Sequence, residues 1–192
     1  MESLHYILLE TERNYNNTEK LGDLDIVVNV NIDDVASINR RCFVKSAPNG
    51  SSLKKGDEVI VHHNIMRDSV KNDGTIDRGV NFIEEGVYFC EENEVIMKRI
   101  AGKGDWICLH DFVFIKPIPS EDIKIGHGLV LVPDARKGMM HFRAELAIGN
   151  KKLKEINVGD RIIFAKFSQH EFLIDGELLY KCEVQDILGI IK

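Results

Sequence analysis

The sequence predicts an all-β protein built from two small β-barrels in tandem. Many short segments rich in β-branched and aromatic residues run along the 192-residue chain, with glycine turns between them. Almost no segment shows the spacing of apolar residues that an amphipathic helix requires. The elements of the first half recur in the same order in the second, and each unit of about 90 residues suits a small barrel.

The first half begins with a strand at residues 6–10, followed by a polar stretch at 11–23 that we expect to form a loop. Further strands are expected at 24–30, 41–45, 86–90 and 94–99, a turn feeding a strand at 54–63, and a short helical turn at 33–37. Pro48-Asn49-Gly50 and Asn72-Asp73-Gly74 have the composition of tight turns, and the second of these is expected at a hairpin tip. Residues 101–104 are expected to form a linker.

The second half repeats this pattern. Its strands are expected at 111–117, 129–132, 142–149, 157–164, 171–177, 178–182 and 186–191. Lys55-Gly56-Asp57 matches Val158-Gly159-Asp160, and Tyr88-Phe89-Cys90-Glu91 matches Tyr180-Lys181-Cys182-Glu183. We therefore predict one barrel at residues 1–104, with an insertion near 67–85, and a second barrel at 105–192.

Composition excludes several classes of function. The net charge is −6 and no basic stripe is present, which argues against nucleic-acid binding. No apolar run approaches the roughly 20 residues that cross a bilayer. Because the N-terminus lacks the basic and apolar regions of a signal peptide, we expect a cytoplasmic protein.

Catalytic and metal-binding motifs are not evident, so we expect no enzyme and no cofactor. The four cysteines occur singly, as expected of reduced, buried residues rather than zinc ligands. His62 and His63 are adjacent residues of an expected strand, so only one could face a given site. The chain contains neither a phosphate-binding loop nor a dinucleotide-binding glycine motif.

The central segment of the second half is Leu129-Val130-Leu131, which follows the polar run at residues 119–128. Three aliphatic residues in this place form either an inward-facing strand or a tip presented to a partner. Ile26-Val27-Val28 has the corresponding place in the first half. It is a candidate for a second docking tip, although its polar flanks favour a structural strand.

Several segments of the second half together carry a family resemblance. They are, in chain order, Leu109-His110-Asp111 with Val113, Ile115 and Lys116; Gly128-Leu129-Val130-Leu131; Arg143-Ala144-Glu145-Leu146-Ala147-Ile148-Gly149-Asn150; Val158-Gly159-Asp160-Arg161-Ile162-Ile163-Phe164; and Asp186-Ile187-Leu188-Gly189-Ile190. In this order they resemble the GroES-type co-chaperonins. The first half shares only the order of elements and a few of these residues.

The chain also departs from the bacterial pattern of this family. Only eight residues separate Gly149 from Val158, where bacterial members have a longer β-hairpin that forms the roof of the dome. The equivalent stretch at residues 46–53 is also short. This is similar to phage-encoded co-chaperonins, whereas the tandem arrangement resembles plastid ones, although no transit peptide is visible. A phage origin, with action in the host cytoplasm, would fit both departures.

The resemblance implies a non-catalytic partner protein. A mobile loop at residues 117–140 would present Gly128, Leu129, Val130 and Leu131 to a GroEL-type chaperonin, and ATP would act in that partner. A homo-oligomeric ring, a heptamer in this family, is implied as well. We expect residues 6–10 and 187–191 to be edge strands where neighbours pair. The alternative is a structural ring or scaffold protein, for example in a phage virion.

Overall fold

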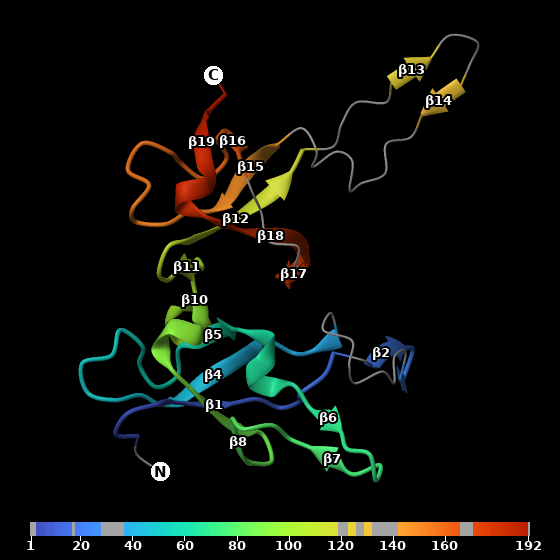
Figure 1. Ribbon diagram of the computed structural model, residues 1–192, viewed down its shortest axis with the longest axis vertical. Coiled ribbons are helices and arrows are strands. Elements are labelled where there is room, and N and C mark those ends of the chain that lie inside the picture. The colour runs from blue at the N-terminus through green and yellow to red at the C-terminus, as the bar shows by residue number, and fades with distance from the viewer. Residues whose placement is uncertain are drawn as a thin grey trace. The chain divides into compact units, whose positions relative to one another are not determined.

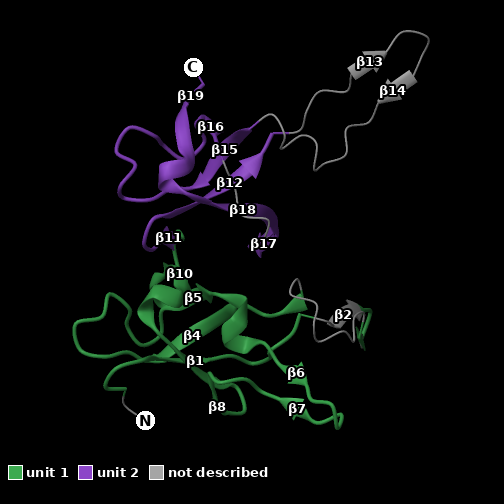
Figure 2. Cartoon of the chain, viewed as in Figure 1, with its two compact units in different colours: residues 1–106 green, residues 107–192 purple. Residues whose placement is uncertain are grey.

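The computed structural model describes residues 3–16, 18–27, 37–118, 123–125, 129–131, 142–165 and 171–191. The chain divides into two compact units, residues 1–106 and 107–192 (Figure 2). Every sheet is antiparallel, and the helical elements of the described residues are short 3₁₀ turns. The prediction of an all-β protein is confirmed.

The first unit is organised around one sheet in which β10, β5, β4, β1, β9 and β8 follow one another (Figure 1). Their bounds are β1 Ile7–Glu10, β4 Arg41–Ser46, β5 Glu58–Val61, β8 Phe82–Glu84, β9 Val87–Cys90 and β10 Val95–Arg99. Two small hairpins, β2 (Thr18–Leu21) with β3 (Leu24–Val27) and β6 (Ser69–Val70) with β7 (Ile76–Asp77), pair only within themselves in the described part. The 3₁₀ turns are η2 His63–Met66, η3 Glu92–Glu94 and η4 Ile100–Gly102.

The second unit has a six-stranded sheet in the order β17, β18, β12, β15, β16, β19. Its strands are β12 Phe112–Pro117, β15 Arg143–Ile148, β16 Arg161–Phe164, β17 Glu171–Ile174, β18 Glu177–Glu183 and β19 Ile187–Ile190. The short strand β11 (Ile107–Cys108) precedes it, and the turn η6 (Val184–Asp186) joins β18 to β19. A separate pair is formed by β13 (Ile123–Ile125) and β14 (Leu129–Leu131).

The same pairing scheme builds both units. Strand β1 pairs with β4 and β9 just as β12 pairs with β15 and β18. Strands β4, β5 and β10 follow one another as β15, β16 and β19 do. Even an irregularity is shared, since the register shifts between Leu8 and Leu9 in β1 and between Phe114 and Ile115 in β12.

The repeated Gly-Asp dipeptide forms the same corner in each unit. Gly56 and Gly159 have positive φ angles of 88° and 93°, which a residue with a side chain adopts only with strain. Each glycine N–H donates across the corner at 2.8 Å, to the carbonyl of Val44 and of Leu146 respectively. The carboxylate after each glycine accepts a backbone N–H from three residues upstream, at 3.0 Å and 2.8 Å. The sequence repeat therefore marks a repeated structural corner.

Alternating apolar residues of the strands form the core of the second unit. Its buried members are Val113, Ile115, Ala144, Leu146, Ile162, Phe164, Tyr180 and Cys182. Burying one aliphatic or aromatic side chain of this size contributes about 1.5–3 kcal/mol. The four cysteines are free and buried, as expected, and burial raises the pKa of the Cys90, Cys108 and Cys182 thiols to about 12.

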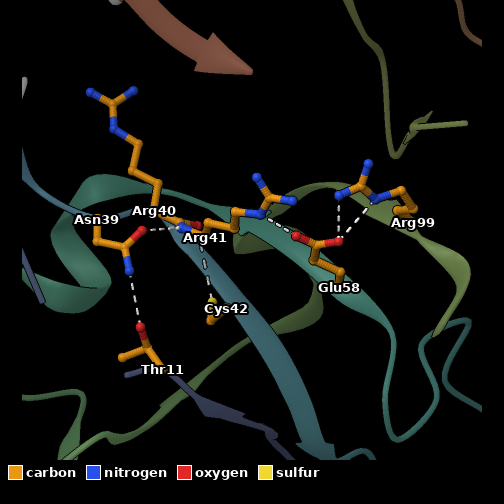
Figure 3. A network of polar contacts seen from close by, with 7 residues as sticks. All are labelled: Thr11, Asn39, Arg40, Arg41, Cys42, Glu58 and Arg99. Atoms are coloured by element: carbon orange, nitrogen blue, oxygen red, sulfur yellow. Dashed lines mark hydrogen bonds and ion pairs between the residues drawn. The ribbon is translucent and has the colours of Figure 1, made fainter. Parts of the chain in front are cut away.

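A buried ion-pair network distinguishes the first unit (Figure 3). Glu58 is 2% exposed at the start of β5, and its carboxylate accepts hydrogen bonds from Arg41 and, at 2.7 and 2.9 Å, from Arg99. The Arg41 and Arg99 guanidinium carbons lie 5.8 and 4.5 Å from the centroid of the Trp106 ring. In the second unit the position of Glu58 in the ladder is taken by Arg161, so the network has not been repeated.

Four expectations about local structure were wrong. The stretch expected as a loop at residues 11–23 contains strand β2, and the polar run at 119–128 contains β13. Strand β5 ends at Val61, so His62 and His63 are not strand residues, and their ring centroids lie only 4.2 Å apart. Strand β1 pairs on both sides and is not an edge strand. Most of the helical turn expected at 33–37 lies outside the described residues.

The two segments that correspond to the missing roof contain turns and no strand. Residues 47–57 join β4 to β5, and residues 149–160 join β15 to β16, and both segments are fully described. In the second, the Asn150 side chain donates to the carbonyls of His110 and Phe112 at 2.8 and 2.9 Å. The connection thus folds back onto the start of β12 instead of extending as a hairpin.

Candidate functional site

Three of the four predicted docking residues lie in a small hairpin between β12 and β15 in the chain. Leu129, Val130 and Leu131 form strand β14, whose Cα partners in β13 are Ile125, Lys124 and Ile123 respectively. Within the described part of the chain β14 pairs with β13 and with no strand of the main sheet. Gly128 and most of the predicted mobile loop at 117–140 lie outside the described residues. The tripeptide is thus a strand, but one belonging to a separate hairpin.

The return from this hairpin into the main sheet is anchored by Phe142. Its φ of 50° places it in the left-handed region, which residues with side chains seldom adopt. Its ring packs edge-to-face on the buried Phe164 ring, with centroids 6.1 Å apart, and its carbonyl accepts the Phe164 N–H at 3.0 Å. Sequence reasoning missed this anchor, because a phenylalanine before a strand carries no signal of a strained backbone.

The first unit has a hairpin in the same topological place. Strands β2 and β3 lie between β1 and β4, as β13 and β14 lie between β12 and β15. Of the candidate second tip, Ile26 and Val27 end β3, and Val28 lies outside the described residues. Ile26 is 41% exposed and Val27 57% exposed, so neither is a core residue. Both residues lie in a strand, as the interpretation favoured from the polar flanks expects, and their role in docking stays a prediction.

A set of hydrogen bonds closes the base of the β2–β3 hairpin. Tyr15 and Ile38 form an antiparallel bridge, flanked by backbone hydrogen bonds of 2.7 and 2.8 Å. The buried Asn39 side chain donates to the Thr11 hydroxyl at 3.0 Å and to the Arg13 carbonyl at 2.8 Å (Figure 3 shows the first of these). The segments at residues 14–16 and 37–39 are therefore held together at the base of the hairpin.

Two ionisable groups of the first unit, Asp68 and Tyr88, have pKa values shifted by burial. Among the described residues, no group of three or more His, Cys, Asp or Glu side chains is placed to hold a metal ion. Burial raises the pKa of Asp68, although the nearby Arg78 opposes this shift, and raises the pKa of Tyr88 to about 12. Both groups lie under the β6–β7 insertion. In the described residues no helix is long and apolar enough to span a membrane.

Comparison with known proteins agrees with this architecture. Residues 106–191 match the family model described as the chaperonin 10 kDa subunit. The co-chaperonin GroES of Bartonella tribocorum is 34% identical over 91 residues, which cover 43% of this chain and 91% of that protein. The co-chaperonin GroES of Rickettsia typhi is 33% identical over 92 residues, 44% of this chain and 95% of that protein.

These matches define a co-chaperonin. The chain belongs to the GroES-type co-chaperonin family, as the motifs of its second half predicted. The family match covers the second unit, and the first unit lies outside it.

Proposed function

We propose that this co-chaperonin caps a GroEL-type chaperonin ring and assists ATP-dependent protein folding. The residues that dock are Gly128, Leu129, Val130 and Leu131, carried by the predicted mobile loop at residues 117–140. The observation that supports this most directly is that Leu129–Leu131 belongs to a hairpin separate from the main sheet of the unit that matches the family. A strand of the core would not be available to a partner.

Docking through a short apolar segment gives contacts that are individually weak. Full burial of each aliphatic side chain contributes about 1.5–3 kcal/mol, and ordering the loop offsets several kcal/mol of that gain. A ring that presents several tips gains about 10²–10⁴-fold through effective concentration. Such contacts are released together when the partner changes conformation, as a lid that opens and closes requires.

The proposal extends to the whole chain as two GroES-like barrels in one subunit of a homo-oligomeric ring. The shared pairing scheme of the two units supports this, although the first unit lies outside the family match. Strand β19 ends the sheet of the second unit and offers unpaired backbone groups to a neighbour. We take the ring to be a heptamer by family resemblance.

We further propose that the protein works without catalysis and without a cofactor of its own, and that ATP acts in the chaperonin. The alternative of a structural ring or scaffold protein explains the fold equally well. It gives no reason, however, for the similarity to bacterial co-chaperonins over nine-tenths of their length. The cytoplasmic location and the phage origin stay predictions.

The proposal is tested by protection and by substitution. Limited proteolysis should cleave the free protein within residues 119–140, and adding a GroEL-type chaperonin with ATP should protect these bonds. Leu129→Asp and Leu131→Asp should each abolish binding while thermal unfolding stays nearly unchanged. Leu173→Asp, at an exposed position of β17, is the matched control and should bind normally. If the first two variants unfold instead, the tripeptide belongs to the core and the proposal is wrong.

A further inference from the structure

The hairpin of the first unit presents an apolar surface to solvent. Leu21 and Leu24 are each 69% exposed, and Ile26 and Val27 are also exposed. Isolated exposed apolar residues are ordinary on a protein surface, but four of them within seven residues form a patch. In the described part of the chain, β2 and β3 pair only with each other. The hairpin therefore pairs with no strand of the main sheet in the described part of the chain.

The register places three of these side chains on one face. Leu21 is the Cα partner of Leu24, and directly opposed residues of an antiparallel pair project to the same side. Ile26 follows Leu24 by two residues and shares that side. The chain turns between the strands through Gly22, whose φ of 65° suits a tight two-residue turn. The result is a compact apolar tip rather than a scattered set of residues.

The position of this tip identifies its partner. It is inserted between β1 and β4, the strands that correspond to β12 and β15 around the β13–β14 hairpin. Both hairpins oppose aliphatic residues across the ladder: Leu21 with Leu24 in the first, and Ile125 with Leu129 and Ile123 with Leu131 in the second. The β6–β7 insertion also exposes apolar residues, but the described residues of the second unit contain no hairpin that corresponds to it.

We propose that the β2–β3 hairpin is a second chaperonin-docking element, so that each chain engages a GroEL-type chaperonin at two points. Leu21, Leu24 and Ile26 form its contact face, and the closure of its base by Tyr15, Ile38 and Asn39 limits the region that must be ordered on binding. Two tips on one chain raise the effective concentration of each for its site. This inference rests on the proposed function, because it assigns the same partner to a second site.

The test compares full-length variants for binding to a surface-immobilised GroEL-type chaperonin in the presence of ATP. One variant carries Leu24→Asp with Ile26→Asp, and a second carries Leu129→Asp with Leu131→Asp. Val70→Asp is the control, since Val70 is 56% exposed in the other small hairpin of the same unit. We expect the first variant to bind at least about tenfold more weakly than the wild type, and the control to bind normally.

The outcomes separate the two claims. If the Leu129/Leu131 variant loses binding while the Leu24/Ile26 variant keeps it, the second docking element is wrong and the proposed function stands. If only the Leu24/Ile26 variant loses binding, the second element is supported and the proposed tip at 129–131 is wrong. If neither variant loses binding, both claims fail. Equal weakening by Val70→Asp would show nonspecific adhesion and overturn the inference.

The folding of each variant is checked separately, because a loss of binding through unfolding would mislead. Trp106, the single tryptophan, lies within the first unit at the end of the ion-pair network. Its emission and thermal transition should match those of the wild type, since all substituted side chains of the first unit are exposed. Should Leu24→Asp with Ile26→Asp unfold the first unit, the hairpin is structural and the inference is wrong.

Discussion

Replacing Glu58 by glutamine should destabilise the first unit strongly, because this buried carboxylate pairs with two arginines. Arg99 donates to one carboxylate oxygen at 2.7 and 2.9 Å, and Arg41 donates to the other. A neutral amide of the same shape removes the negative charge that the mostly buried Arg99 guanidinium faces. Breaking a buried ion pair by removing one member costs about 3–5 kcal/mol. Arg41 is half exposed and can turn to water, so we expect the lower end, about 3 kcal/mol.

The measurement is urea unfolding followed by the fluorescence of Trp106, which reports on the first unit because both arginines lie over its ring. The matched control is Arg161→Gln, the position of the second unit that corresponds to Glu58 in the ladder. Arg161 is exposed, and exposed charges contribute about 0–1 kcal/mol. A loss below about 1 kcal/mol for Glu58→Gln would show that the network is screened by solvent, and would refute this reasoning.

Three further predictions follow from burial. Burial raises the pKa of the Cys90, Cys108 and Cys182 thiols to about 12, so these thiols should resist alkylation at pH 8 until the protein unfolds. Mass spectrometry of samples treated with iodoacetamide would measure this, and rapid labelling of the native protein would contradict their burial. Burial raises the pKa of Asp68 in the folded protein above 3.8, so the native state binds this proton more tightly than the unfolded state does. Stability should therefore fall as the pH rises from 3.8 through the folded-state pKa. Asp68→Asn should flatten this fall in melting curves recorded at several pH values, and an unchanged slope would contradict the prediction. Asn39→Ala should lower the free energy of unfolding by about 1–3 kcal/mol and speed amide hydrogen exchange at the base of the β2–β3 hairpin. Unchanged exchange would mean that the bridge between Tyr15 and Ile38 alone closes the base of the hairpin.

Local chemistry made much of the fold predictable. The Gly-Asp corners need a positive φ and a carboxylate that accepts a nearby N–H, so the same dipeptide recurs wherever that corner recurs. Short segments rich in apolar residues predicted the strands β4 and β15, and the structure gives both strands the same pattern of buried and exposed residues. The hairpin tip at Asn72-Asp73-Gly74 was found by its turn residues, and the structure places it between β6 and β7.

What sequence reasoning missed depends on contacts between distant residues. Strand β2 has the sequence Thr18-Glu19-Lys20-Leu21, which lacks apolar alternation, and it exists as a strand only through its pairing with β3. The central place of β1 is set by pairing with β4 and β9, more than 30 residues away. His62 appeared to continue a strand, but its backbone N–H donates to the Glu94 carbonyl while its ring accepts from Asn64 and caps η2.

For the candidate site, too, local sequence was informative, whereas properties that depend on tertiary contacts were not predictable. The order of the family-like segments drew attention to Leu129-Val130-Leu131. These three aliphatic residues also follow a long polar run. The polar flanks of Ile26 favoured a structural strand, and Ile26 and Val27 do lie in a strand, β3. Sequence could not show that β3 pairs with β2 and leaves both side chains exposed, because exposure depends on the whole tertiary arrangement of the unit.

The two units differ mainly outside their shared pairing scheme. The first unit contains the β6–β7 insertion and the buried Glu58 network, while its corners, register shift and hairpin position match those of the second. Ion pairs in a core rarely add net stability over apolar packing, so the network is more simply explained as a means of fixing the arrangement of β4, β5 and β10.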